Sequence, residues 1–235
     1  MVQLSRSGLT PPSQHDLECL RAQFARQHCI RLPGLLDPDL LSFIRHRLET
    51  AEFAERAHDD IGAELCLTHD VALDLLHFLA NDKKLFELVQ QLTGCARIGC
   101  FIGRIYRMVP GSGHYDSWHS DTRDNRLIGL SLNLGTQHYD GGVFQLRERH
   151  STDILCEVAN TGAGDAILFR IARGLMHQVT SVEGTTPKTA FAGWFHARPE
   201  FLSLLTNGAG RSREEEQTAR GQVVDGRRAL ADGCQ

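Results

Sequence analysis

The sequence repeats one short pattern at four places: a histidine followed two residues later by an aspartate. The four pairs are His58/Asp60, His114/Asp116, His119/Asp121 and His138/Asp140. Along an extended strand, residues i and i+2 project to the same face, so an imidazole and a carboxylate with this spacing can bind one metal ion. Together with a second histidine, such a pair forms the two-histidine, one-carboxylate set that binds non-haem iron and leaves other coordination positions open.

Two of the four pairs lie in surroundings that do not favour a metal site. The sequence around His58/Asp60 is typical of helices, in which residues i and i+2 do not share a face. His138/Asp140 lies in GTQHYDGG, which is typical of a solvated turn between two strands. We therefore look for the metal pair among the other two.

The two remaining pairs stand five residues apart and so project to opposite faces of a continuous strand. Only one of them can then face the interior of a sheet structure. His114/Asp116 lies in the glycine-rich stretch PGSGHYD, whereas His119/Asp121 leads into the strand-like LIGLSLNL. We predict that His119 and Asp121 bind the metal, and His114/Asp116 stays as the alternative.

The third ligand should be a histidine from a distant strand. His177 in GLMHQVT and His196 in GWFHARP lie in strand-like segments, and His150 lies in a charged turn. A lone histidine on a strand is usually a packed or exposed residue. Lys188, eleven residues after His177, favours His177, because a keto acid that chelates iron needs a buried cation for its far carboxylate.

These side chains need a scaffold, and residues 1–96 indicate mainly helices. One helix can begin after Ser13 and a second after Asp37, which Pro38 follows. A third is expected through VALDLLHFLA, and a fourth from near Asp82 to Gly94. Between the first two, CIRLPG reads as a short strand.

From Arg97 onward the pattern changes to short β-branched and aromatic runs separated by turn residues. The expected strands are RIGCFIGRIYRMV, an extended piece at residues 115–121, LIGLSLNL, VFQLRE, ILCEVAN, DAILFR, LMHQVT and TAFAGWFH. Because no helix-length segment separates them, we expect a barrel or double-sheet jelly roll. The predicted organisation is an α+β, mainly β chain: a helical lead-in (1–96) packed on the core, a jelly-roll core (97–198), and a short helix with a polar, flexible tail (199–235).

Composition narrows the class of protein. The 235 residues are 41% hydrophobic and 23% charged, with a net charge of -4, so we expect no nucleic-acid partner. No apolar run is long enough to cross a bilayer and the first residues lack a signal peptide's apolar core, so we expect a cytoplasmic protein without a membrane partner. The seven cysteines include no CxxC pair, which indicates reduced thiols.

Five segments, taken in order, are similar to one known family. They are YRMVPG, WHSD, LSLNL followed by DGGVFQL, GDAILF, and HQVTSVEGTTPKTAFAGWF. This set, over roughly residues 97 to 197, resembles the 2-oxoglutarate and Fe(II)-dependent oxygenase superfamily, especially its prolyl-hydroxylase-like branch. The resemblance implies a double-stranded β-helix core, Fe(II) and 2-oxoglutarate as cofactor and co-substrate, ascorbate as a further candidate cofactor, and hydroxylation of an unactivated C–H bond with succinate and carbon dioxide as co-products.

The resemblance also implies roles for individual residues. His119, Asp121 and His177 match the iron ligands, and Lys188 matches the basic residue that binds the far carboxylate of 2-oxoglutarate. Because lysine is a point charge and not a bidentate fork, a hydroxyl donor should complete this anchor. Ser131 aligns approximately with such a donor. Tyr106 is a second candidate, with a core aromatic as its alternative interpretation.

Other functions and the substrate stay open. A cupin-like metalloenzyme without a keto acid, or a non-catalytic jelly-roll binding module, would use the same scaffold. The substrate is a small molecule or a peptide, and the candidate residues at its entrance are Arg104, Arg107, Trp118, Arg123, Gln145 and Trp194. Residues 111–118 are either a lid or a surface loop, and the sequence leaves the oligomeric state undetermined.

Overall fold

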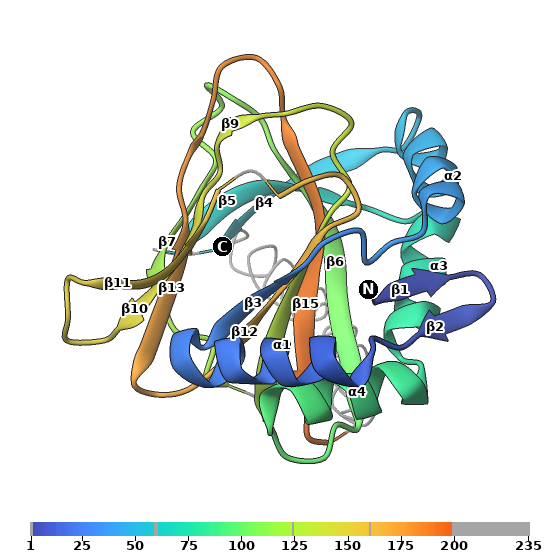
Figure 1. The fold of residues 1–235 in the computed structure, drawn as a ribbon. Helices are drawn as coiled ribbons and strands as arrows, with labels where there is room; N and C mark the ends of the chain where they lie inside the picture. Colours follow the sequence, from blue (N-terminus) through green and yellow to red (C-terminus); the bar gives the residue numbers. More distant parts are fainter. Residues whose placement is uncertain (1, 59–60, 124, 160, 199–235) are drawn as a thin grey trace, which may run out of the picture. The chain divides into compact units, whose positions relative to one another are not determined.

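The helices form where the sequence supplies caps and apolar faces, as the computed structural model shows (Figure 1). Among the described residues they are α1 (Gln14–Gln27), α2 (Pro38–Leu48), α3 (Val71–Ala80) and α4 (Lys83–Thr93). The side chains of Ser13, Asp37, Asp70 and Asp82 each accept a hydrogen bond from a backbone N–H of the first turn, which satisfies donors that the helix leaves free. All four predicted helices are confirmed.

The structure describes residues 2–58, 61–123, 125–159 and 161–198. Residues 1–198 group into one compact unit. The predicted helix and tail at 199–235 lie outside the described residues. Among the residues that are described, no helix combines the length and apolar character needed to cross a membrane.

The strands are antiparallel and build one continuous sheet that rolls up on itself (Figure 1). In the described part of the chain, this sheet has eleven strands in the order β11-β10-β13-β7-β5-β6-β15-β8-β12-β3, with β4 paired to β5. Two small sheets, β1-β2 and β9-β14, lie outside it. The bounds are β1 (Gln3–Ser5), β2 (Gly8–Thr10), β3 (Cys29–Leu32), β4 (Phe53–His58), β5 (Gly62–Leu67), β6 (Cys100–Met108), β7 (Tyr115–His119), β8 (Arg126–Asn133), β9 (Asp140–Gly141), β10 (Phe144–Glu148), β11 (Ile154–Val158), β12 (Ala166–Arg170), β13 (Leu175–Val179), β14 (Val182–Glu183) and β15 (Lys188–His196).

The jelly-roll prediction is confirmed, and each strand predicted after Arg97 is present. The predicted strand CIRLPG is also found, as β3. The helical interpretation around His58 is wrong, because His58 is the last residue of strand β4. Strand β5 lies between β6 and β7 and pairs with both. Strand β4 in turn pairs with β5. These pairings override the local helix propensity of residues such as Glu55, Ala57 and Glu64. The division of the chain at residue 96 stays a prediction.

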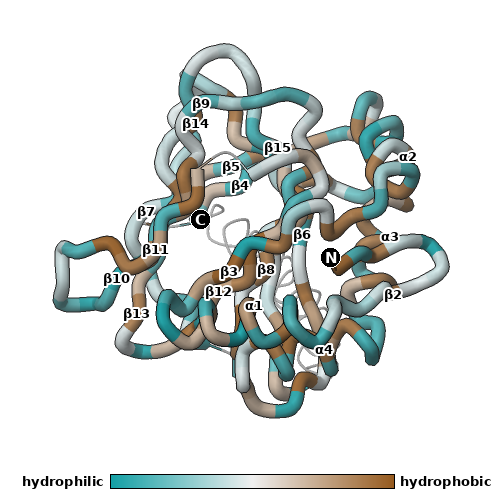
Figure 2. The backbone as a smooth tube through the Cα atoms, in the orientation of Figure 1, coloured by the Kyte–Doolittle hydropathy of each residue, from teal (hydrophilic) through white to brown (hydrophobic). Residues whose placement is uncertain are grey.

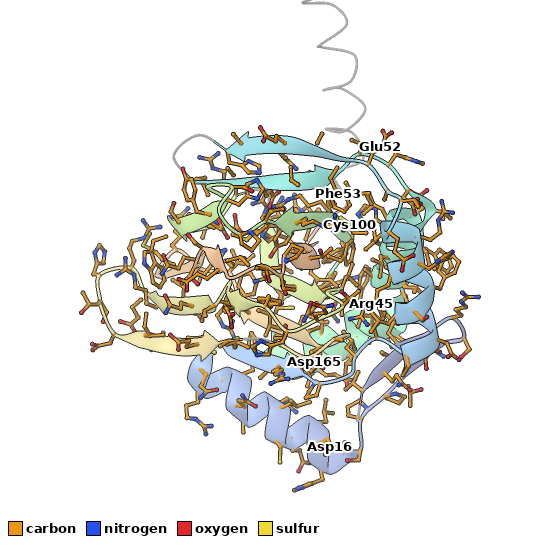
Figure 3. The ribbon with its side chains drawn as sticks, turned by 90° about the horizontal axis from the view of Figure 1, so that it is seen from above. Asp16, Arg45, Glu52, Phe53, Cys100 and Asp165 are labelled. Carbon is orange, nitrogen blue, oxygen red and sulfur yellow. The ribbon has the colours of Figure 1, made fainter. Side chains whose placement is uncertain are left out.

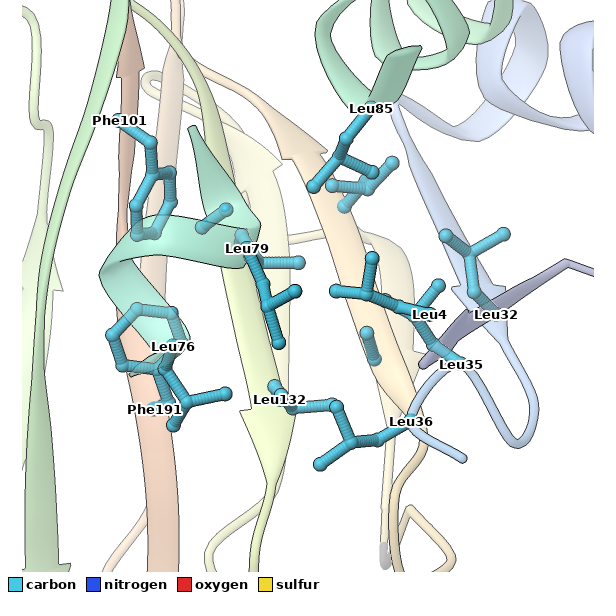
Figure 4. Packing of buried hydrophobic residues seen from close by; sticks show 14 of the residues in the cluster. Leu4, Leu32, Leu35, Leu36, Leu76, Leu79, Leu85, Phe101, Leu132 and Phe191 are labelled. Atoms are coloured by element: carbon cyan, nitrogen blue, oxygen red, sulfur yellow. The ribbon is translucent and has the colours of Figure 1, made fainter. Parts of the chain in front are cut away.

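Two separate apolar layers hold the sheet. The larger one lies between the helices and the outer face of β3, β12, β8, β15 and β6; its members include Leu76, Leu85, Leu132, Phe101 and Phe191. Figure 4 shows these side chains meeting between α3, α4 and the sheet. Removing one such buried leucine typically costs about 2–5 kcal/mol. The smaller cluster fills the inside of the rolled sheet and includes Cys29, Phe144 and Phe169. Hydrophobic segments along β3 and β8, which contribute to the larger cluster, are visible in Figure 2.

Asp165 ties the edge strand β3 to the start of β12. One carboxylate oxygen accepts the backbone N–H of Gly34 at 2.7 Å, and the other accepts the N–H of Gly162 at 2.9 Å and the Nε of Arg31 at 2.9 Å. Figure 3 labels this residue. A buried carboxylate with several donors stabilises both loops that supply them.

We expect Asp165→Ala to lower the free energy of unfolding by about 2–4 kcal/mol, because two backbone N–H groups lose their acceptor. Denaturant unfolding followed by circular dichroism measures this difference. Asp153→Ala, at an exposed position, is the control and should change the value by less than about 0.5 kcal/mol. Equal stability of the two variants would contradict the role given to Asp165.

Candidate metal centre

The antiparallel pairing of β7 with β13 brings two histidines face to face. His119 on β7 is the direct cross-strand partner of His177 on β13, and their ring centroids are 4.3 Å apart. Directly opposed residues of an antiparallel pair project to the same face of the sheet. Here that face is the inside of the rolled sheet, because His177 also contacts Phe169 and Phe144, with ring centroids at 4.8 Å and 6.0 Å.

A glycine on β8 makes room for this packing. Gly129 is the cross-strand partner of Phe169, and a Cβ atom at this position would lie 2.1 Å from Cζ of Phe169. Any larger residue would push the ring from its place beside His177. The absence of a side chain on β8 thus helps to fix an imidazole on β13.

A β-bulge in β7 places a further acid beside His119. The partners of His119 and Asp116 on β13 are His177 and Val179, so three residue steps on β7 match two on β13. The additional residue changes the alternation of side chains. As a result, Oδ1 of Asp116 lies 3.3 Å from Nδ1 of His119. The prediction that the His114/Asp116 pair and the His119/Asp121 pair project to opposite faces therefore fails for Asp116.

Asp121 completes the cluster from a position beyond the end of β7. Its Oδ2 lies 3.3 Å from Nε2 of His177, and its Oδ1 lies 3.7 Å from Nε2 of His119. One ligand atom from each of the three residues lies within 4.8 Å of those of the others. Two imidazole nitrogens and one carboxylate oxygen at this spacing fit a first-row divalent ion.

A hydrogen bond at Nδ1 of His119 leaves Nε2 as the nitrogen for metal binding. Its Nδ1 lies 2.7 Å from the carbonyl oxygen of Ser117. Because a carbonyl oxygen can only accept, Nδ1 carries a proton, and Nε2, on the side of Asp121, is the nitrogen that can bind a metal ion in place of a proton. A histidine held in this tautomer by a backbone carbonyl is a common arrangement at metal sites.

The charges of the cluster attract a cation. Burial raises the pKa of Asp121, but the contacts with His119 and His177 outweigh it and hold this pKa well below its usual range. Burial lowers the pKa of His119, whereas the hydrogen bond with Asp121 and the charge of Asp116 raise it to about 9. An anionic carboxylate between two imidazoles therefore stabilises a positive charge, which either a proton or a metal ion can supply.

Lys188 is buried on the same inner face, at the start of β15. Its Nζ donates a hydrogen bond to the carbonyl oxygen of Gly142 at 2.7 Å and lies 5.7 Å from the ring centroid of Tyr139. Burial lowers the pKa of Lys188 to about 8, and the charge of Asp116 opposes this shift. Among the residues that the structure describes, no carboxylate forms an ion pair with this ammonium. The arrangement suits an external anion.

The two predicted hydroxyl partners of the anchor lie on neighbouring strands. Tyr106 on β6 pairs with Ala190, two residues from Lys188 on β15, and Ser131 on β8 pairs with Ala192. These positions share the alternation of Lys188 along β15 and therefore its face. Burial raises the pKa of Tyr106, so its hydroxyl stays protonated and can donate a hydrogen bond. Contact of either hydroxyl with 2-oxoglutarate stays a prediction.

The other candidate histidines lie elsewhere. His114 is buried, and its Nδ1 accepts the backbone N–H of Val109 at 2.9 Å, so it stabilises the glycine-rich turn. His138 and His150 are exposed. His196 is the last residue of β15, eight residues along the strand from Lys188. None of these four belongs to the cluster of His119, Asp121 and His177 found in the described residues.

The predicted entrance residues divide into two groups. Arg104 and Trp194 face the inside: Arg104 contacts Glu64 through two nitrogens, and its guanidinium lies 5.8 Å from the Trp194 ring. Trp118 and Gln145 lie on the outer face, where Arg147 covers the Trp118 ring at 4.1 Å. The remaining two also lie away from the cluster: Arg107 is over the Phe53 ring at 4.2 Å, and Arg123 is exposed. The sequence indicates Asp116 only as the partner of His114 and gives no signal for Arg126 or Glu64, because the bulge in β7 and the insertion of β5 leave no pattern in the sequence.

Comparison with known proteins relates the β-rich core to one family. Residues 103–196, from β6 to β15, match the model of the 2OG-Fe(II) oxygenase superfamily. This matched segment contains His119, Asp121, His177 and Lys188. The match and the metal cluster indicate a 2-oxoglutarate-dependent Fe(II) oxygenase, with Fe(II) and 2-oxoglutarate as its cofactors. They favour this class over the cupin-like and non-catalytic alternatives. No curated protein matches the chain in a sequence search.

Solved structures of several oxygenases share the fold. A prolyl-4-hydroxylase from Pseudomonas putida is 19% identical, with a TM-score of 0.58, over 78% of this chain and 100% of that one. A 2OG-Fe(II) oxygenase family oxidoreductase from Burkholderia pseudomallei is 16% identical, with a TM-score of 0.60, over 84% and 97%. The epimerase SnoN from nogalamycin biosynthesis is 14% identical, with a TM-score of 0.57, over 81% and 89%. The fold of this oxygenase is therefore prolyl-hydroxylase-like.

We expect His177→Ala to weaken Fe(II) binding by more than about 100-fold, because it removes one of three clustered candidate ligands. Anaerobic equilibrium dialysis with Fe(II), followed by iron determination, measures the affinity. His138→Ala is the matched control, since it removes an exposed histidine from another histidine–aspartate pair. Wild-type iron content in the His177 variant would remove this residue from the ligand set.

Proposed function

We propose that this oxygenase hydroxylates an unactivated C–H bond of a small molecule or a peptide and forms succinate and carbon dioxide. The observation that carries the proposal is the cluster of His119, Asp121 and His177 on the same inner face as the buried Lys188. In this assignment the first three hold Fe(II), and Lys188 binds the far carboxylate of 2-oxoglutarate. Bound together, the iron and the keto acid supply the oxidising chemistry.

The chain's own residues position the reactants and limit the access of water. Lys188 supplies an ammonium that water does not surround, because it is 6% exposed, and an ionic hydrogen bond is strong in such a place. Phe144 and Phe169 pack beside His177 and give that side of the cluster an apolar wall. Asp121 supplies a carboxylate to the proposed ligand set. Halogenation would need the coordination position of this carboxylate for a halide ion, so the presence of Asp121 supports hydroxylation.

The surroundings of the cluster offer polar contacts for a substrate. Arg104 and Glu64 form a partly buried ion pair, and burial raises the pKa of Asp116. The neighbours in fold include the P. putida prolyl-4-hydroxylase and a Trichoplax adhaerens prolyl hydroxylase in complex with a hypoxia inducible factor peptide fragment. They also include the epimerase SnoN. Both peptides and natural-product intermediates therefore belong in a substrate screen.

The first experiment is an anaerobic titration of the protein with Fe(II), with and without 2-oxoglutarate, followed by visible absorption. A weak charge-transfer band that appears only with both reagents supports chelation at this site. Incubation in air with panels of peptides and small molecules should then couple succinate formation to a product one oxygen atom heavier. Succinate that forms with a dehydrated or epimerised product would overturn the hydroxylation assignment.

Replacing the proposed anchor should affect mainly the co-substrate. We expect Lys188→Ala to raise the KM for 2-oxoglutarate by about 10- to 100-fold, because one charge-assisted hydrogen bond is lost. The measurement is succinate formation at varied 2-oxoglutarate and saturating Fe(II). Unchanged saturation behaviour would assign the far carboxylate to another cation.

The KM for 2-oxoglutarate should also depend on pH. The pKa of Lys188 is lowered to about 8 by burial, and the ammonium is charged below that value. Raising the pH through 8 therefore removes the charge, and we expect KM to rise by about tenfold per pH unit above it. Lys188→Arg stays charged throughout this range and should flatten the profile. A wild-type KM that stays constant from pH 7 to 9 would contradict the assignment.

A further inference from the structure

The position of Asp121 is not fixed by the β ladder that fixes the two histidines. His119 and His177 are cross-strand partners, whereas Asp121 lies two residues after the end of β7. Its own carbonyl accepts a local turn hydrogen bond from the backbone N–H of Arg123 at 2.8 Å. Contacts of the carboxylate itself must therefore define its orientation.

Two side chains from other strands make these contacts, one on each oxygen. Nε1 of Trp194, on β15, donates a hydrogen bond to Oδ2 of Asp121 at 2.6 Å. NH1 of Arg126, at the start of β8, donates to Oδ1 at 3.0 Å. The Arg126 guanidinium also lies 3.7 Å from the centroid of the Trp194 ring. The three side chains thus form one connected group, with Asp121 12% exposed and Arg126 19% exposed.

We propose that Trp194 and Arg126 are positioning residues for the metal centre: they hold the carboxylate of Asp121 in one orientation toward the ion. The proposal rests on the proposed function only in taking Asp121 as a metal ligand. It assigns both residues to Asp121, although Trp194 was expected to contact the substrate.

The chemistry of a carboxylate supports this role. Its two oxygens have about four lone-pair directions, and the indole and guanidinium donors occupy one on each oxygen. One direction remains on each oxygen, and these oxygens lie 3.7 Å from Nε2 of His119 and 3.3 Å from Nε2 of His177. The two donors thus hold the carboxylate in one orientation toward an ion bound by the imidazoles. Coordination positions away from these three side chains then stay open for 2-oxoglutarate and dioxygen. Groups that hold ligands in place at metal centres typically contribute 10- to 100-fold to metal affinity.

The two donors are not equivalent. The neutral indole of Trp194 orients the carboxylate and leaves its charge in place. The cationic Arg126 orients it as well, but its charge repels a metal ion. Loss of the indole N–H should therefore lower metal affinity more than loss of the guanidinium, while both changes alter how Asp121 binds.

The experiment uses Co(II) as an oxygen-stable probe of the metal centre, with its visible spectrum as the report on coordination. Trp194→Phe keeps an aromatic ring and removes only the N–H donor. We expect its dissociation constant for Co(II) to rise at least about tenfold, with a changed absorption spectrum. Arg126→Met keeps the apolar stem and should change the spectrum with a smaller loss of affinity.

Trp118→Phe is the matched control, because Trp118 lies on the outer face of the sheet under Arg147. It should bind Co(II) as the wild type does. Thermal unfolding of each metal-free variant separates a loss of fold from a loss of positioning, and Arg126→Met tests the inference independently of Trp194. A wild-type affinity and spectrum in both variants would overturn it.

The same titration on His177→Ala keeps the two proposals apart. Loss of Co(II) binding there, with normal binding in Trp194→Phe and Arg126→Met, would remove the positioning role and leave the proposed function intact. Normal binding in His177→Ala would instead contradict the metal centre itself.

Discussion

The pairing of β7 with β13 is the constraint on which the metal centre depends. It places His119 directly opposite His177, so two imidazoles meet inside the rolled sheet without any loop having to fold over them. The bulge in β7 then adds Asp116 beside His119. Rigid elements hold functional groups more precisely than loops do, and here the register of one ladder positions most of the site.

The rest of the sheet supports that ladder from both sides. Phe169 fills the space that Gly129 leaves open and packs on His177. The helices cover the opposite face of β15, β8 and β12 through a separate apolar cluster. Because the larger apolar cluster lies on that opposite face, the inner face has room for polar side chains such as Lys188, Asp121 and Arg104. A sheet with one face for stability and one for chemistry is suited to changes of substrate without loss of the fold.

Much of this could be predicted from local sequence signals. The capping residues Ser13, Asp37 and Asp82 predicted where helices begin. Short β-branched and aromatic runs separated by turn residues predicted the strands after Arg97. His119, Asp121 and His177 were singled out by spacing and by the similarity of ordered motifs, and the structure brings them together. Their role as iron ligands stays a prediction, as does that of Lys188.

The features that could not be predicted from the sequence depend on tertiary structure. The hairpin of β4 and β5 has helix-forming residues, and only its pairing with β6 and β7 makes it extended. The face of Asp116 depends on one additional residue in a ladder, which alternation cannot reveal. Arg126 and Trp194 reach Asp121 from strands whose neighbours in the sheet are set by the whole topology. Such contacts carry no periodic signal.

The buried ammonium of Lys188 has a thermodynamic consequence for the whole protein. No carboxylate in the described part of the chain forms an ion pair with it, and keeping such a cation from water raises the free energy of the native state. A dicarboxylate that reaches this group removes part of that cost and binds only folded molecules, so it should protect the enzyme against unfolding in proportion to its concentration. Cellular levels of a central metabolite would then influence the lifetime of the enzyme as well as its rate.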